Sequence, residues 1–251
     1  MGAPTELTFN ADEPIPLTGE RTAPGVAEEN YWFQRHVVAY RWAAARIGGM
    51  RVLDAGSGEG YGTDILADTA RRVVGVDLDA EIVRRAAAVY SRPGFQPANL
   101  VSLPFRNASF DAVVSLQVIE HLHTPHEFIA ECARVMTPGG LLILSTPNRL
   151  TFSPEGTRNP FHSFEFAPDE LRATVARHFS AVEILGTSHG PRVRTIERLL
   201  RGGLPERLIA QPAPEWPAWL RRCVARVRPG DFRVRSTHLE RSLDLIATAR
   251  A

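Results

Sequence analysis

The sequence contains no lysine, and all 29 of its basic residues are arginine. Without lysine the protein cannot use a Schiff-base lysine or a lysine nucleophile. It also lacks the lysine with which P-loop NTPases hold phosphate. Arginine stays protonated at any accessible pH. Arginines can therefore bind anions here, whereas proton transfer at neutral pH falls to the eight histidines or to a carboxylate with a shifted pKa.

Cysteines are few, and long apolar runs are missing. The two cysteines, Cys132 and Cys223, make neither a disulfide framework nor a metal-ligand spacing, so we expect a reducing, cytoplasmic environment. No segment approaches the roughly 20 apolar residues that cross a bilayer, and the N-terminus lacks the pattern of a signal peptide. We therefore expect no membrane insertion.

Strand-like and helix-like segments alternate along the 251 residues. This alternation predicts an α/β fold, namely a Rossmann-like, mostly parallel sheet of seven strands with helices on both faces. Ligands bind such sheets outside the carboxyl ends of the strands. The strands are predicted over 51–55, 72–77, 95–98, 110–116, 140–146, 179–185 and 242–248.

A glycine-rich stretch with the pattern D-x-G-x-G-x-G follows the first predicted strand, from Asp54 to Gly60. Glycines let a ligand approach the backbone closely. The G-x-G-x-x-G of dinucleotide-binding proteins fails here, because Tyr61 stands at the position of the third glycine. Asp77 closes the second strand, where a carboxylate accepts hydrogen bonds from ribose hydroxyls. Asp54 would repel a pyrophosphate but suits a ligand with an ammonium or sulfonium.

These features resemble the class I S-adenosylmethionine (SAM)-dependent methyltransferases. The resemblance covers roughly residues 30–187 and the last strand, and it implies SAM as cofactor and S-adenosylhomocysteine as product. It is carried by VLDAGSGEGYG (52–62), VVGVDLD (73–79), ANLVSLPFRNASFDAVVS (98–115), VIEHL (118–122) and ARVMTPGGLLILSTPN (133–148).

The resemblance assigns contacts with SAM by position. It implies that Asp77 accepts hydrogen bonds from the ribose hydroxyls and that Leu78 lies against the adenine. The glycines implied to line the methionine and ribose are Gly56, Gly58 and Gly60.

Further contacts are implied beyond the second strand. Asn99 stands where the family usually has Asp, and its side-chain carbonyl can still accept a hydrogen bond from the adenine amino group. The backbone of Leu100 would meet the neighbouring ring nitrogen, and Gln117 would lie under the cofactor. Two residues stay open: Asp54 either touches the ligand or orients the glycine loop, and Asp111 is more typical of a residue that fixes a turn.

A carboxylate and an imidazole follow the fourth predicted strand, at Glu120 and His121. A hydroxyl acceptor is a poor nucleophile and needs a base or a metal. His121 is the leading candidate for a general base, or else it is structural, and Glu120 would orient it or bind a cation. Some family members hold a divalent ion such as Mg²⁺ with E-x-x-E-H here, although Gln117 replaces the first Glu. A capping box predicted from Thr124 to Glu127 starts the next helix.

Other histidines are weaker candidates. His162 follows the fifth strand, in a loop that commonly closes over the acceptor in this family, and is a candidate substrate or catalytic contact. His189 begins a basic segment and is a further candidate. His123 and His126 are interpreted as solvated residues at a helix start.

Three segments resemble one subgroup more closely: LTGERTAPGVAEENYWF (17–33), STPNRLTFSP (145–154) and NPFH (159–162). They are similar to the actinobacterial sugar O-methyltransferases linked to the polymethylated polysaccharides of mycobacteria, of the methylmannose or methylglucose type. This resemblance implies that the N-terminal arm and first helix fold over the cofactor and acceptor. It also suggests that Tyr31 and Arg35 contact the methionine carboxylate of SAM, with packing of Tyr31 and Trp32 in the core as the alternative.

Charge is uneven along the chain. Residues 1–187 carry 16 arginines and 22 acidic residues, whereas residues 188–236 carry 11 arginines and 4 acidic residues, a net charge of +7. We predict four parts: an N-terminal arm or lid (1–29), a SAM-binding Rossmann-like domain (30–187), a basic helical cap on the acceptor side (188–236) and the last strand (237–251).

The sequence therefore predicts a SAM-dependent O-methyltransferase. The leading acceptor is a hydroxyl of a sugar or oligosaccharide, in the biosynthesis of a polymethylated polysaccharide. The alternative acceptor is a small phenolic, quinone-like or other natural product. A nucleic-acid partner is not expected, because the chain shows no stacking platform or known RNA motif. The oligomeric state stays open.

Overall fold

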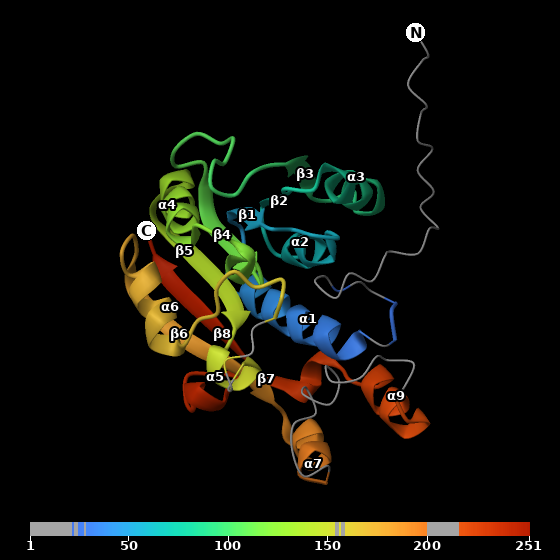
Figure 1. Cartoon of the computed structure of the whole chain (residues 1–251). Coiled ribbons are helices and arrows are strands. Elements are labelled where there is room, and N and C mark those ends of the chain that lie inside the picture. The colour runs from blue at the N-terminus through green and yellow to red at the C-terminus, as the bar shows by residue number, and fades with distance from the viewer. Residues whose placement is uncertain (1–21, 23–24, 28, 154–155, 157–158, 200–215) are drawn as a thin grey trace.

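The computed structural model describes residues 22, 25–27, 29–153, 156, 159–199 and 216–251 (Figure 1). They form one eight-stranded sheet in the order β3-β2-β1-β4-β5-β8-β6-β7. The strands are β1 (Arg51–Ala55), β2 (Arg72–Asp77), β3 (Gly94–Pro97), β4 (Phe110–Leu116), β5 (Met136–Pro147), β6 (Ser180–His189), β7 (Phe232–Arg235) and β8 (Asp244–Arg250).

The direction of the strands fixes where a ligand site can form. The pairs β1–β2, β1–β4, β2–β3 and β4–β5 are parallel, whereas β8 runs antiparallel between β5 and β6. The sheet grows in one direction from β1 through β2 and in the other from β4 through β5. This reversal between β1 and β4 is the switch point at which such sheets bind ligands.

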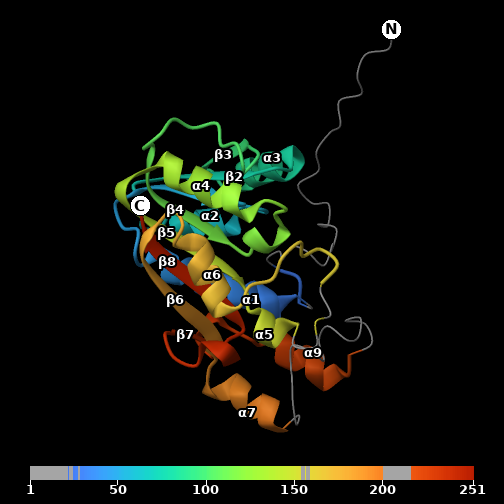
Figure 2. The same ribbon diagram turned by 60° about the vertical axis from the view of Figure 1, so that its left-hand side comes forward.

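Helices cover both faces of the sheet (Figures 1 and 2). Phe128 of α4 and Leu171 of α6 belong to the core on one face, and Tyr40 of α1 and Leu66 of α2 belong to the core on the other. Among the described residues, none of the helices is both long and apolar enough to cross a membrane. The helices and helical turns are α1 (Asn30–Ala44), α2 (Tyr61–Leu66), α3 (Ala80–Val89), η1 (Ile119–His121), α4 (Pro125–Val135), α5 (Arg149–Phe152), α6 (Pro168–Val175), α7 (Pro191–Leu199), α9 (Ala218–Ala225), η3 (Pro229–Asp231) and η4 (Leu239–Arg241).

The predicted fold class is confirmed, but the predicted number of seven strands is wrong. The extra strand, β7, lies inside the segment 188–236 that was predicted to be helical, and it pairs antiparallel with β6. Its sequence, FRVR, alternates apolar and charged residues, with Phe232 buried and Arg233 exposed. Such alternation is typical of a β-strand. The pattern spans only four residues, however, and it was overlooked in a segment that also contains α7 and α9. The predicted arm, 1–29, lies mostly outside the described residues.

Candidate active site

The glycine loop between β1 and α2 is shaped by positive φ angles. Gly56 and Gly60 have φ of 90° and 85°, a region that side chains with a Cβ rarely adopt. Space is short as well, because a Cβ on Gly60 would lie 2.7 Å from the Cβ of Ala86 on α3. The loop is also tied to β2, since the backbone N–H groups of Gly56 and Ser57 each donate to the carbonyl of Val76 at 2.8 Å.

Asp77 lies beside this loop at the carboxyl end of β2. Its carboxylate accepts hydrogen bonds from the backbone N–H of Gly58 at 3.0 Å and from that of Asp79 at 3.1 Å. Asp79 caps α3 as predicted, accepting from the N–H of Glu81 at 3.0 Å. Leu78 is 74 % exposed, which fits a side chain that packs against a flat ring. Gly58, Asp77 and Leu78 thus lie together at one edge of the sheet.

Asp54 is fully buried, and its position favours one of its two predicted roles. Thr63 donates its hydroxyl to the carboxylate at 2.6 Å, and Tyr40 donates at 3.4 Å. Burial raises the pKa of Asp54 to about 7, and the neighbouring Asp77 carboxylate adds to the rise. These contacts join β1, α1 and α2 behind the glycine loop, and they favour the role of orienting the loop over contact with the ligand.

The predicted contacts after β3 and β4 lie at the same edge. Asn99 is exposed, and its side-chain carbonyl accepts from the N–H of Val101 at 3.1 Å, while Leu100 is buried. Gln117 has a φ of 58°, and its amide donates to the hydroxyl of Ser145 at 3.0 Å. A left-handed conformation is rare for residues other than glycine and is common at functional sites.

Tyr31 and Arg35 lie in the protein core. Tyr31 is fully buried, and its hydroxyl lies 2.6 Å from Nε2 of His189. Arg35 is also buried. Its guanidinium forms an ion pair with the Asp244 carboxylate through two hydrogen bonds, one of which joins Nε to Oδ2 at 3.2 Å. Both side chains therefore have partners inside the protein, and their contact with the methionine carboxylate stays a prediction.

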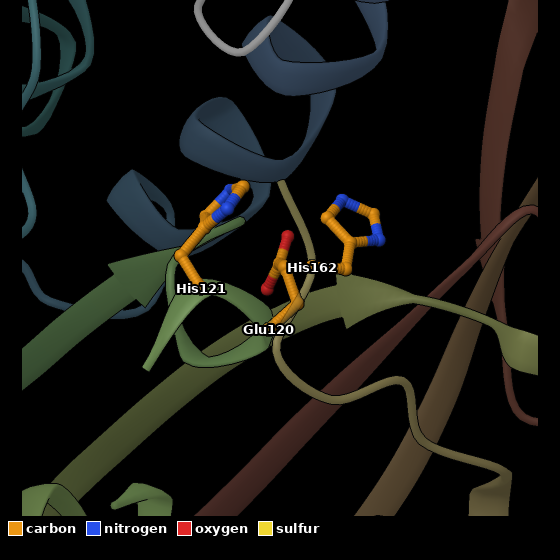
Figure 3. A group of neighbouring side chains, drawn as sticks. All are labelled: Glu120, His121 and His162. Carbon is orange, nitrogen blue, oxygen red and sulfur yellow. The ribbon is translucent and has the colours of Figure 1, made fainter. Parts of the chain in front are cut away.

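Glu120, His121 and His162 meet at the carboxyl end of β4, where η1 faces the loop that follows β5. One ligand atom from each residue lies within 4.8 Å of those of the others. Figure 3 shows the carboxylate between the two imidazole rings. We refer to these three residues as the acid–imidazole cluster. Sequence reasoning named each of them, and the structure brings them together.

Glu120 is the buried member of the acid–imidazole cluster, at 1 % exposure. Burial raises its pKa to about 8, and the carboxylates of Asp244 and Glu165 add to the rise. Within the described part of the chain, its Oε2 has no hydrogen-bond partner. A buried oxygen without a partner is costly, so this atom has the property expected of a group that binds a ligand or an ion.

The two histidines present their rings through defined contacts. Nδ1 of His121 lies 2.9 Å from the carbonyl of Phe161, and Nδ1 of His162 lies 2.9 Å from Oε1 of Glu165. Because a carbonyl can only accept, Nδ1 of His121 carries the hydrogen, and Nε2 carries the lone pair when the ring is neutral. The rings are 5.2 Å apart in an edge-to-face arrangement.

The helix after the cluster begins at Pro125 as predicted, but the predicted capping box is absent. The Thr124 side chain makes no capping hydrogen bond; instead its backbone carbonyl accepts from the N–H groups of Glu127 and Phe128. His123 and His126 are exposed, as expected. Asp111 lies at the start of β4 and pairs with Arg51 at 2.7 Å, so it joins β1 to β4 away from the carboxyl ends.

Sequence reasoning missed two buried acids beside the acid–imidazole cluster, Glu165 and Asp244. Glu165 is 3 % exposed and Asp244 is 5 % exposed. The spacing of His162 and Glu165, three residues apart, is a signal that could have revealed the first pair. No local signal marks Asp244, because its partner Arg35 lies 209 positions away in the chain.

Comparison with known proteins agrees with this geometry. A methyltransferase domain family matches residues 53–144. The chain is 44% identical to a probable S-adenosylmethionine-dependent methyltransferase of Mycolicibacterium smegmatis, over 99% of both proteins. It is 33% identical to a ubiquinone biosynthesis O-methyltransferase of a Caulobacter species, over 51% of this chain and 58% of that protein.

Among solved structures, a SAM-dependent methyltransferase of Thermotoga maritima, described as a possible histamine N-methyltransferase, has a TM-score of 0.60 at 17% identity. That match covers 90% of this chain and 95% of the other, and it supports the fold. The chain belongs to the SAM-dependent methyltransferases, with SAM as its cofactor.

Proposed function

We propose that this enzyme transfers the methyl group of SAM to a hydroxyl of a sugar or oligosaccharide. The observation that carries the proposal is the acid–imidazole cluster, because a hydroxyl needs a base or a cation beside it before it can attack. The cluster lies at the end of β4, on the same edge of the sheet as the glycine loop. Cofactor and acceptor would therefore meet between β1 and β4.

Bound SAM supplies a sulfonium methyl group that is transferred by in-line displacement. The residues proposed to hold it are the three glycines of the loop, Asp77, Leu78, Asn99, the Leu100 backbone and Gln117. Their fit rests on the positive φ angles, which open the backbone to close approach, and on Asp77, whose carboxylate has lone pairs left for the ribose hydroxyls.

Two proposed arrangements of the acid–imidazole cluster can lower the cost of deprotonating the acceptor. In the first, Nε2 of His121 takes the hydroxyl proton, and Glu120 in its ionised form stabilises the imidazolium. In the second, all three side chains bind a divalent cation. One carboxylate and two imidazoles with open positions are a donor set that transition metals accept, and the orphaned Oε2 of Glu120 fits that role. Mg²⁺, which prefers oxygen ligands, fits this set less well.

The polar surroundings of the cluster support a sugar acceptor. Within the described residues, buried oxygens of Glu120 and Glu165 have no hydrogen-bond partner. Buried polar groups in native proteins are nearly always paired, so these oxygens suit a ligand that carries several hydroxyls. The resemblance of segments 17–33 and 145–154 to sugar O-methyltransferases agrees with this choice.

A phenolic or quinone-like acceptor is the second candidate. It is favoured by the similarity to proteins named ubiquinone biosynthesis O-methyltransferases, which extends over about half of the chain. Such an acceptor needs an apolar platform for its ring, and Phe161 and Phe164, exposed by 45% and 40%, flank His162 in the loop.

An acceptor screen with methyl-labelled SAM tests the proposal. The panel holds manno- and gluco-oligosaccharides, methylated and unmethylated, beside catechols and hydroxylated quinones, each with and without EDTA. Labelling of a sugar is the expected result, and labelling of phenols alone would overturn the sugar assignment. Loss of activity with EDTA, restored by Mn²⁺ or Co²⁺, supports the cation arrangement, whereas activity that survives EDTA supports His121 as the base.

A further inference from the structure

Glu165 makes a contact that neither the cofactor site nor the acid–imidazole cluster itself explains. Its side chain is 1 % exposed, and that of His162 is 6 % exposed. Oε1 lies 2.9 Å from Nδ1 of His162, whereas Oε2 has no partner among the described residues. Burying a carboxylate costs folding free energy unless hydrogen bonds or nearby charges compensate. We therefore expect the Glu165 carboxylate to have a specific role.

The role of Glu165 is not to hold the loop after β5 in place, because backbone hydrogen bonds already do so. The N–H groups of Ser163 and Phe164 both donate to the carbonyl of Glu120, at 2.8 and 3.0 Å. The backbone of Asn148 also bridges to Phe166. The loop is thereby fixed to η1 and to the end of β5 on either side of Glu165. What the backbone leaves undetermined is the orientation and the protonation pattern of the His162 ring.

We propose that Glu165 is a positioning residue that fixes the tautomer of His162. A carboxylate accepts the hydrogen of Nδ1, so the lone pair of the neutral ring is assigned to Nε2. The ring is also held between Phe152, with centroids 5.2 Å apart, and His121, likewise 5.2 Å away. With both Nδ1 and the ring plane fixed, the lone pair on Nε2 is the one that the proposal assigns to the acid–imidazole cluster.

This role deepens the proposed function and rests on it, because it matters only where His162 acts as a base or as a ligand. A carboxylate partner on the far nitrogen raises the basicity of a histidine and restricts its orientation, and removing such a partner typically weakens metal binding by about 10–100-fold. Glu165 would therefore serve the cation arrangement, or an arrangement in which His162 itself is the base.

The first test measures the tautomer of His162 in the metal-free protein by nitrogen NMR with ¹⁵N-labelled histidine. The spectra are recorded at about pH 8.5, some two units above the ordinary pKa of histidine. We expect the Nδ1–H tautomer in the wild type, its loss in Glu165→Ala and its retention in Glu165→Gln, whose amide oxygen still accepts. An Nε2–H tautomer in the wild type, or an unchanged tautomer in Glu165→Ala, would overturn the proposal.

The second test measures Co²⁺ affinity by visible absorption. We expect Glu165→Ala to weaken binding about 10–100-fold, with a smaller loss in Glu165→Gln. Glu183→Gln, an exposed carboxylate on β6, is the matched control and should bind as the wild type does. Unchanged affinity in Glu165→Ala would contradict the role.

The two tests separate failure of the inference from failure of the proposed function. A wild type that binds no Co²⁺ removes the cation arrangement, but the tautomer measurement still decides the role of Glu165. SAM binding by each variant, followed by calorimetry, shows that the variant is folded. Should Glu165→Ala fail to fold, Glu165→Leu gives the same tautomer test with the volume of the side chain kept.

Discussion

The two halves of the site differ in how their buried polar groups are satisfied. On the cofactor side, Asp54 and Asp77 bond to Thr63, Tyr40 and the backbone around the glycine loop. On the proposed acceptor side, buried oxygens of Glu120 and Glu165 have no partner within the described residues. Ser57 is the exception on the cofactor side, because its buried hydroxyl also lacks a partner.

If the proposed site is correct, this difference implies that the cofactor side is largely formed before SAM binds, whereas the acceptor side presents groups that a ligand must satisfy. When a binding site is already formed, little of the binding free energy is used to order its residues. Unsatisfied groups on the acceptor side give selectivity instead, because an acceptor that cannot bond to them leaves them buried and unpaired. Substitutions in one half should therefore leave the function of the other half unchanged.

The largest effect is expected from Glu120→Gln on the acceptor side. The amide can neither stabilise an imidazolium nor bind a cation as a carboxylate does, so we expect kcat to fall by about 10²–10⁴-fold. SAM affinity, measured by calorimetry, should stay within a factor of about two. Glu183→Gln should leave both quantities unchanged. A parallel loss of SAM affinity in Glu120→Gln would show that the two halves are coupled.

Asp77→Asn tests the cofactor half. Replacing a charged acceptor by a neutral one removes about 1.5–3 kcal/mol of hydrogen-bond free energy. We therefore expect SAM affinity to fall by about 10–100-fold, with little change in kcat at saturating SAM. A variant that binds SAM normally but turns over slowly would reverse the assignment of the halves.

Gly60→Ala tests whether the glycine loop is pre-shaped by packing. Alanine at this position combines a positive φ with a Cβ placed 2.7 Å from Ala86. Gly49→Ala is the matched control, because it shares the positive φ, at 74°, but has open space around its Cβ. We expect Gly60→Ala to lower the free energy of unfolding by about 1–3 kcal/mol more than the control does. Equal losses in urea denaturation would show that the packing is irrelevant.

The smallest effect is a pH dependence carried by Asp54. Because burial raises its folded pKa to about 7, its stabilisation is complete below the unfolded pKa of about 4 and is lost as the pH rises to about 7. Asp54→Asn cannot ionise, so its stability relative to the wild type should increase by at least about 1 kcal/mol between pH 4 and pH 8. Denaturation midpoints across this range measure the change.

Sequence reasoning predicted the cofactor half well because its signals are local. The strands at 51–55, 72–77 and 110–116 match β1, β2 and β4 residue for residue, since short apolar runs bounded by turns mark buried strands. The helix cap at Asp79 follows from its own sequence neighbours. The positions of the glycines then follow from the turn that joins β1 to α2.

The acceptor half depends on contacts between distant segments, which the sequence does not record. Tyr31 and Arg35 bond to His189 and Asp244, which lie more than 150 positions further along the chain, and no local pattern signals either pair. Glu165 escaped notice because a single carboxylate in a loop has no periodicity. Its burial is set by how the loop folds against η1.

The place of β8 in the sheet has a consequence for how the protein is made. In the described sheet β8 lies between β5 and β6, yet it begins at Asp244, long after β6 ends at His189. A nascent chain that has released β6 but not β8 exposes two bare strand edges, and such edges invite pairing with other chains. Closure of this sheet must therefore wait until translation has passed β8, and during that interval the edges of β5 and β6 that β8 will cover are open to pairing with other chains.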